Sequence, residues 1–107
     1  MCKLQYSKAS QVFTLYVPAE FVKEKGWKKG DHIVVIEQKD NITLKKAGDL
    51  SSIKGTYMLM KLQYTKQSQV YTITIPAQFV NSKGWKPGDN IKATNYDDTI
   101  SLKKIEV

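Results

Sequence analysis

Lys3 to Lys46 reads KLQYSKASQVFTLYVPAEFVKEKGWKKGDHIVVIEQKDNITLKK, and the pattern returns 58 positions later, from Lys61 to Lys104, as KLQYTKQSQVYTITIPAQFVNSKGWKPGDNIKATNYDDTISLKK. The two copies align without a gap. Arrays of small repeats generally need about three units to be stable, so a fused dimer with one shared core is the better interpretation of two. We therefore expect two repeats, 1–46 and 61–107, joined by a linker over 47–60, to fold together as a pseudo-dimer within one chain.

The composition favours one small folded domain with a basic surface. The chain has 107 residues, 41% of them hydrophobic, and its net charge is +7 with lysine as every one of its 17 basic residues. The first copy has nine lysines against five acidic residues, and the second has seven against three, so both are basic. A surface of this kind favours polyanions, with nucleic acid first. The alternative is a lysine-rich surface that only keeps the protein soluble.

The cysteine content and the apolar runs bear on the compartment. Cys2 is the only cysteine, so no disulfide can form within the chain and a reducing interior is expected. The start of the chain lacks the apolar core of a signal peptide. No apolar run approaches the ~18 residues that a membrane-spanning segment requires. We expect a cytoplasmic protein without membrane contact.

Each copy is expected to run strand, strand, short helix, strand, strand. The stretch 70–75 alternates apolar and polar residues, which is the period of a half-buried strand. Pro18 ends the corresponding strand of the first copy and suits the first turn of a helix, expected over 19–25. Gly26 suits the left-handed position that ends a helix. A type II turn over 86–89 and two closing strands, 33–37 and 41–45 in the first copy, complete the unit.

The two copies differ on one strand face. Val34 and Ile36 in the first copy correspond to Lys92 and Thr94 in the second. An apolar face of this kind is expected to be covered. Either the apolar end of the linker, 57–60, covers it, or a second molecule does, which would give a further homodimer through the Val34/Ile36 face.

Residues that could support catalysis or metal binding are scarce. The single histidine, His32, has Asn90 as its counterpart, so the repeat does not contain a repeated histidine site. One cysteine and one histidine do not supply the four ligands of a structural zinc site. Trp27 and Trp85 are expected in the core rather than as base-stacking platforms. We expect no enzyme, no metal and no cofactor.

Three motifs in order resemble the AbrB/MazE/SpoVT family: Thr74-Ile75-Pro76, then Gly84-Trp85-Lys86-Pro87-Gly88-Asp89, then the segment 99–104. The first copy repeats them less closely, for example as Gly26-Trp27-Lys28-Lys29-Gly30-Asp31. The resemblance covers both copies. It implies a mostly β fold with one short helix per repeat, in which two tandem repeats exchange hairpins to build one swapped-hairpin β-barrel. It also implies a DNA-binding transcription regulator or an antitoxin.

The first hairpin of each copy is the expected DNA-binding surface, set side by side with the other hairpin against one duplex. The candidate contacts are Lys3, Lys8, Ser10, Gln11, Lys61, Lys66, Gln67, Ser68 and Gln69. Family members use arginines in this region, whereas lysine is a hydrated point charge better suited to phosphates than to guanine edges. We therefore expect a double-stranded DNA-binding protein with modest sequence specificity. The alternatives are an antitoxin-like or other protein-interaction module, and a binder of RNA or single strands.

Overall fold

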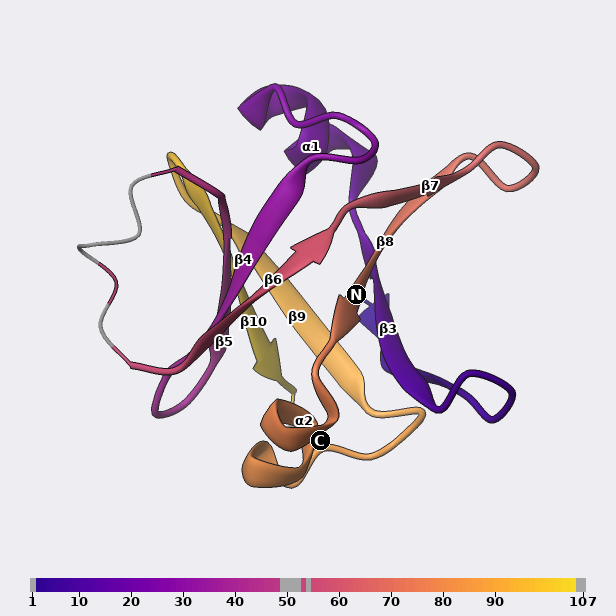
Figure 1. The fold of residues 1–107 in the computed structure, drawn as a ribbon, viewed down its shortest axis with the longest axis vertical. Helices are drawn as coiled ribbons and strands as arrows, with labels where there is room; N and C mark the ends of the chain where they lie inside the picture. The colour runs from indigo at the N-terminus through magenta and orange to yellow at the C-terminus, as the bar shows by residue number, and fades with distance from the viewer. Residues whose placement is uncertain (1, 49–52, 54, 106–107) are drawn as a thin grey trace.

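The computed structural model describes residues 2–48, 53 and 55–105, which form two antiparallel sheets and two short helices (Figure 1). The strands are β1 (Cys2–Lys3), β2 (Gln5–Ser7), β3 (Val12–Val17), β4 (His32–Glu37), β5 (Ile42–Lys46), β6 (Tyr57–Lys61), β7 (Gln63–Thr65), β8 (Val70–Ile75), β9 (Asn90–Asn95) and β10 (Thr99–Lys104). The helices are α1 (Ala19–Lys25) and α2 (Ala77–Lys83). The expected mostly β class with one short helix in each repeat is confirmed.

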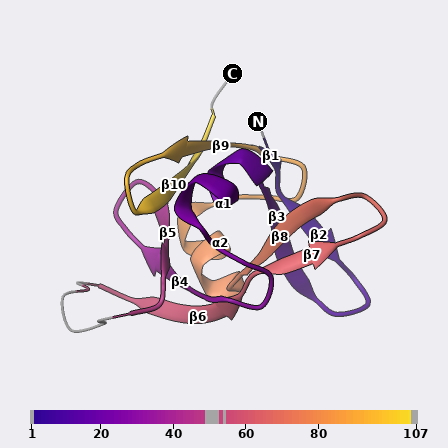
Figure 2. The same cartoon turned by 90° about the horizontal axis from the view of Figure 1, so that it is seen from above.

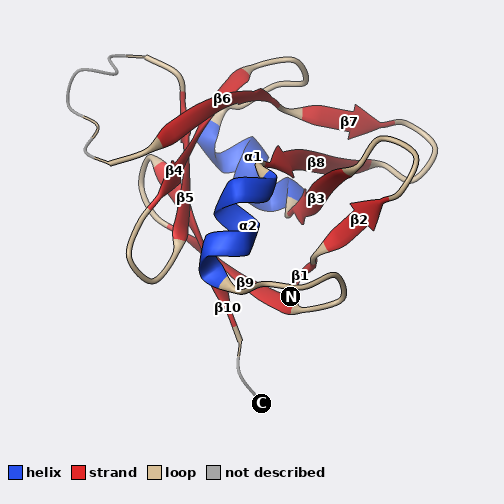
Figure 3. Ribbon diagram, turned by 60° about the horizontal axis from the view of Figure 1, so that its bottom comes forward, coloured by secondary structure: helices blue, strands red, loops and turns tan. Residues whose placement is uncertain are grey.

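Both sheets contain strands from both repeats, in an order that reads the same from either end. The larger sheet has the order β1-β9-β10-β5-β4-β6, and the smaller has the order β2-β3-β8-β7 (Figures 2 and 3). At the centre of each sheet a strand pairs with its own counterpart from the other repeat, β5 with β10 and β3 with β8. The sequence repeat is therefore matched by a repeat in strand pairing.

The first strand of each repeat pairs with a strand of the other repeat. Lys3 in β1 lies opposite Asn90 in β9, and Lys61 in β6 lies opposite His32 in β4. Directly after these strands, the buried Leu4 donates its backbone N–H to the carbonyl of Asp89 at 2.9 Å. Leu62 makes the equivalent bond to Asp31, also at 2.9 Å. Backbone hydrogen bonds thus tie the start of each repeat to the turn of the other.

The expected closed barrel is wrong, because the strands form two open sheets. Leu4 separates β1 from β2, and its backbone bonds to a turn instead of to a strand. Leu62 separates β6 from β7 in the same way. The chain crosses from one sheet to the other at these two leucines, so the hydrogen-bond ladder is not continuous around the fold.

The end of the predicted linker is a strand. Residues 57–60 belong to β6, whose backbone groups pair with β4, while 49–52 and 54 lie outside the described residues. Tyr57 lies opposite Ile36 and Leu59 opposite Val34, as the first of our two alternatives for this face expects. Val34 is fully buried and Ile36 is 6% exposed. Val34 and Ile36 are therefore buried within the chain, beside the strand that the end of the linker forms.

The two helices begin and end as the sequence predicts. Pro18 precedes α1 with φ −55°, and Gly26 follows it in the left-handed conformation with φ 71°. The N–H of Gly26 donates to the Lys23 carbonyl and that of Trp27 to the Val22 carbonyl, which is the Schellman pattern of helix termination. The bonds recur after α2. Each helix has seven residues, and within the described part of the chain none is long and apolar enough to cross a membrane.

The core lies between the two sheets and beneath the helices. Its members come from both repeats in matching pairs, such as Leu15 with Ile73 and Trp27 with Trp85. The buried cluster is Leu4, Leu15, Val17, Val22, Trp27, Ile33, Val35, Ile42, Leu44, Leu62, Ile73, Ile75, Phe79, Val80, Trp85, Ile91, Ile100 and Leu102. Burial of this shared apolar surface is the main stabilising contribution to the fold.

Candidate nucleic-acid interface

Two hairpins of the smaller sheet bear most of the predicted DNA contacts. The tip between β2 and β3 spans 8–11, and the tip between β7 and β8 spans 66–69. Seven of the nine predicted residues are at these tips, and all seven are exposed: Lys8, Ser10, Gln11, Lys66, Gln67, Ser68 and Gln69. The other two, Lys3 and Lys61, are exposed but lie in β1 and β6 of the larger sheet. The structure therefore groups the tip residues and leaves these two lysines at the bases of the hairpins.

Each tip ends in a glutamine with an unusual backbone. Gln11 has φ 55° and Gln69 has φ 56°, the only positive φ values outside glycine in the described residues. Glycine or asparagine adopts this left-handed conformation at lower cost. The N–H of Gln69 donates to the Thr65 carbonyl at 2.7 Å, which closes the second tip. The backbone at both tips thus has a conformation that the glutamine side chain does not favour.

An aromatic pair stiffens each hairpin. Tyr6 lies opposite Phe13, and Tyr64 lies opposite Tyr71. The ring centroids are 4.8 Å apart in both pairs, and the ring planes are tilted by 50° and 48°. Cross-strand aromatic pairs of this kind stabilise two-stranded ribbons. Each tip therefore projects from a ribbon that an aromatic pair stabilises.

The two tips lie at opposite ends of the smaller sheet, which corrects the side-by-side arrangement. Because β3 and β8 are antiparallel, Phe13 near one tip lies opposite Ile75, far from the other tip. The tip centres are about eleven residue steps apart along the paired strands, which is at most roughly 36 Å in that direction. Both tips nevertheless project on the same side of the molecule, on the right in Figure 1. The hairpins are neighbours in one sheet, with their ends spread apart.

A polar strip joins the tips across the outer face of this sheet. Gln5, Thr14 and Thr74 form one cross-strand row. Tyr16, Thr72 and Gln63 form the next. Tyr16 is 44% exposed, whereas its neighbour Leu15 is buried, so these rows face away from the core. The sequence analysis did not select these residues as contacts, although the alternation in 70–75 marks them as the polar side of the strand.

The tryptophans are buried as expected, and the aspartates at 31 and 89 hold turns. Trp27 and Trp85 are 5% and 6% exposed and belong to the core. The Lys28 backbone N–H donates to Asp31 Oδ2 at 2.8 Å and holds the pKa of that carboxyl below its usual value, with Lys46 at 3.6 Å acting in the same direction. Asp89 has the equivalent partners, and its pKa is lowered for the same reason. These carboxylates fix turns.

Histidine, cysteine and carboxylate groups do not gather in the described part of the chain. No three of them lie close enough together there to hold a metal ion. Comparison with known proteins gave no matching family model, no matching curated protein and no matching solved structure. The functional argument therefore depends on the chain's own geometry and chemistry.

Proposed function

We propose that the protein binds double-stranded DNA through its two hairpin tips and acts as a transcriptional regulator of modest sequence specificity. The observation that carries the proposal is the pair of exposed, lysine-bearing tips on one side of the molecule. The tips lie at most roughly 36 Å apart along the strands, so they can be as far apart as the ~34 Å of one helical turn of DNA. Two tips with this spacing can reach the same face of a duplex in successive turns of the groove.

The chemistry of the tips supports contact with the phosphate backbone. Lys8 and Lys66 provide point charges for phosphates, and the serine and glutamine side chains can donate hydrogen bonds. The left-handed glutamines add support, since a costly residue retained at the same place in both repeats suggests that its side chain is needed. Base reading is expected to be weak and unequal, because Gln67 has Ala9 as its counterpart.

The proposed fold assignment follows from the same repeat. We infer that the crossed pairing of β1 with β9 and of β6 with β4 arises from hairpin exchange between two AbrB-like repeats fused in one chain. The resemblance of the turn and helix motifs to that family supports this assignment. In this proposal the linker joins two repeats that would be separate subunits in a homodimer.

A titration with a short duplex at two salt concentrations tests the proposal. If Lys3, Lys8, Lys61 and Lys66 contact four phosphates, the affinity should fall roughly 100-fold between about 50 mM and 200 mM salt. A single-stranded oligonucleotide should compete poorly. An RNA duplex should also compete poorly, because the deep, narrow major groove of RNA does not admit such tips. Absence of duplex binding at low salt would refute the proposal, and stronger binding to RNA would favour the RNA-binding alternative.

A second candidate function, binding to another protein chain, is favoured by the exposure of β6. Tyr57, Met58 and Leu59 are 38%, 39% and 48% exposed, and among the described strands β6 ends its sheet. The partner proposed is a second copy, because antiparallel pairing of β6 with itself about Leu59 sets Lys61 opposite Tyr57 and avoids opposed like charges. Light scattering on the purified chain separates the cases, since this candidate requires a dimer without DNA.

A further inference from the structure

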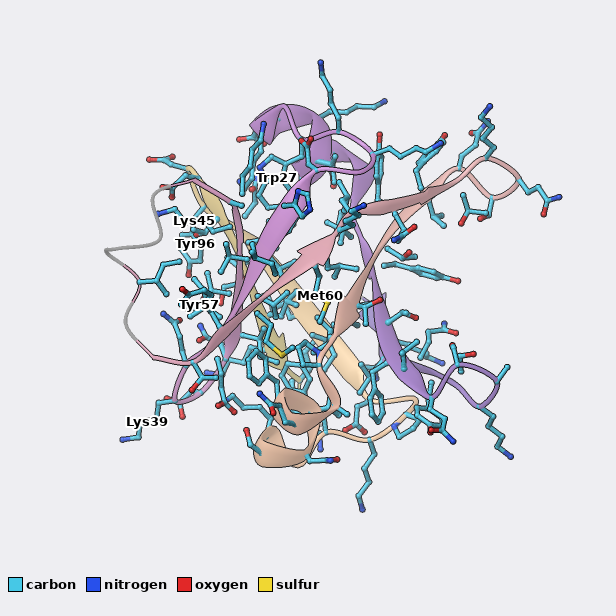
Figure 4. All side chains as sticks on the ribbon, in the orientation of Figure 1. Trp27, Lys39, Lys45, Tyr57, Met60 and Tyr96 are labelled. Atoms are coloured by element: carbon cyan, nitrogen blue, oxygen red, sulfur yellow. The ribbon has the colours of Figure 1, made fainter. Side chains whose placement is uncertain are left out.

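A basic hollow lies at the C-terminal end of α2. The hollow measures about 660 Å³ and lies between α2, β10 and the turn that joins β4 to β5. Its lining is Lys39, Asp40, Ser82, Lys83, Trp85, Lys103 and Lys104. We call it the Lys39 hollow. Figure 4 shows Lys39 at the lower left, on the side of the molecule opposite the hairpins.

The repeat provides a matched second hollow with different charges. It measures about 300 Å³ and is lined by Glu24, Lys25, Trp27, Lys45, Lys46, Asp97 and Asp98, each of which is 58 positions from a residue of the Lys39 hollow. Two exchanges change the charge: Lys39 corresponds to Asp97, and Ser82 corresponds to Glu24. The Lys39 hollow has four lysines against one carboxylate, a net +3, whereas the second has three lysines against three carboxylates and is neutral.

Ion pairs use only half of the lysines in the Lys39 hollow. Lys83 Nζ lies 3.6 Å from Glu37 Oε2, and Lys104 Nζ lies 3.3 Å from Asp89 Oδ2. Lys39 and Lys103 have no ion-pair partner among the residues that the structure describes. The hollow therefore has two amino groups that are not neutralised by a carboxylate within ion-pair distance.

In the second hollow, hydrogen bonds to neutral groups hold two of the charged side chains. Lys25 Nζ donates to Asn95 Oδ1 and to the Tyr96 carbonyl, and Asn95 Nδ2 donates to Glu24 Oε2 at 2.8 Å. Asp97 occupies the position in this hollow that Lys39 occupies in the other. Equivalent residues thus line both hollows, which differ in net charge and in volume.

We propose that the Lys39 hollow binds a phosphate-bearing anion. Lys39 and Lys103 would contact the phosphate oxygens, because their amino groups are suited to phosphate as point charges. Charge-assisted hydrogen bonds to phosphate are the strong class of such contacts. The volume is within the range of small-ligand sites and is large enough for more than one phosphate group. The site is independent of the hairpin tips, so it goes beyond the proposed binding of duplex DNA.

Binding of inorganic pyrophosphate to the full chain, measured by calorimetry at low salt, tests this site. One pyrophosphate should bind per chain, and Lys39→Asp, which copies the residue of the second hollow, should weaken binding about tenfold or more. Lys39 is exposed in a turn, so thermal unfolding should show that this variant folds normally. A native chain that binds no pyrophosphate, or an affinity that Lys39→Asp leaves unchanged, would overturn the proposal.

The second hollow offers the reciprocal variant. Asp97→Lys combined with Glu24→Ser gives it the charges of the Lys39 hollow and should raise the stoichiometry from one pyrophosphate to two. Lys8→Ala with Lys66→Ala is the control at the hairpins, and loss of pyrophosphate binding in that variant would move the anion site to the tips and overturn the proposal.

Duplex titration of Lys39→Asp identifies the source of the phosphate. Unchanged duplex affinity assigns the site to a free anion, and reduced affinity assigns it to the DNA backbone.

Discussion

Replacing Lys8 and Lys66 together with alanine is expected to weaken duplex binding by roughly 60-fold at about 0.1 M salt. Each lysine removed from a phosphate reduces the magnitude of the slope of log affinity against log salt by about 0.9. The slope of the double variant should therefore be smaller in magnitude by about 1.8. Both side chains are exposed and have no ion-pair partner among the described residues, so thermal unfolding should hardly change. Fluorescence anisotropy of a labelled duplex measures the affinity.

The matched control removes the same charge from the larger sheet. Lys45 and Lys92 lie in β5 and β9 of that sheet, neither lines the Lys39 hollow, and Figure 4 shows Lys45 on the side of the molecule away from the hairpins. Lys45→Ala with Lys92→Ala should reduce duplex affinity about threefold or less, because salt screens charges that lie more than about 10 Å from the phosphates. If both double variants lose the same affinity, binding follows net charge and the hairpin assignment is wrong.

Replacing Trp85 with alanine is expected to destabilise the fold by about 3–5 kcal/mol. The Trp85 side chain is 6% exposed and belongs to the core cluster. The backbone N–H of Trp85 donates to the Val80 carbonyl at 3.0 Å, at the end of α2. Truncation removes the buried indole and leaves a cavity that the surrounding strands fill only partly. For a chain of this size the unfolding midpoint should fall by roughly 12–20 °C. Circular dichroism is the suitable probe, since the variant also removes one of the two fluorescent tryptophans.

The repeat supplies an internal comparison for this result. Trp27→Ala should cost a similar amount, because Trp27 is 5% exposed and has the equivalent bond to Val22. Tyr96→Ala removes an aromatic side chain that is 55% exposed and should cost less than about 0.5 kcal/mol. A Trp85→Ala variant as stable as Tyr96→Ala would contradict the packing of this residue and the shared core that it helps to form.

Local features of the fold could be read from the sequence, whereas the pairing of distant strands could not. Pro18 and Gly26 gave the ends of α1 correctly, since both act through their own backbone preferences. The predicted type II turn over 86–89 is confirmed, because Gly88 has φ 90° and the Asp89 N–H donates to the Lys86 carbonyl. Residues 57–60, which lie in β6, were expected at the end of the linker, because their apolar run has no alternation and the partner strand β4 is remote in sequence.

The candidate sites show the same division. A first hairpin in each copy was predicted from the sequence, but the separation of the tips follows from the antiparallel pairing of β3 with β8, which no local pattern encodes. The Lys39 hollow was missed because it combines residues from three distant segments, such as Lys39 and Lys103. A comparison of the two repeats by charge does reveal the Lys39 and Asp97 difference, but only the structure shows that these residues line equivalent hollows.

The central claim is that both hairpin tips contact one duplex at the same time. The most direct test is an amide NMR titration of the isotopically labelled protein with a duplex of about two helical turns. We predict that signals from 8–11 and 66–69 shift together, saturate at one duplex per chain and leave the turn at Lys39 unaffected. Shifts confined to one tip, or shifts along Tyr57–Lys61 with neither tip affected, would contradict the claim.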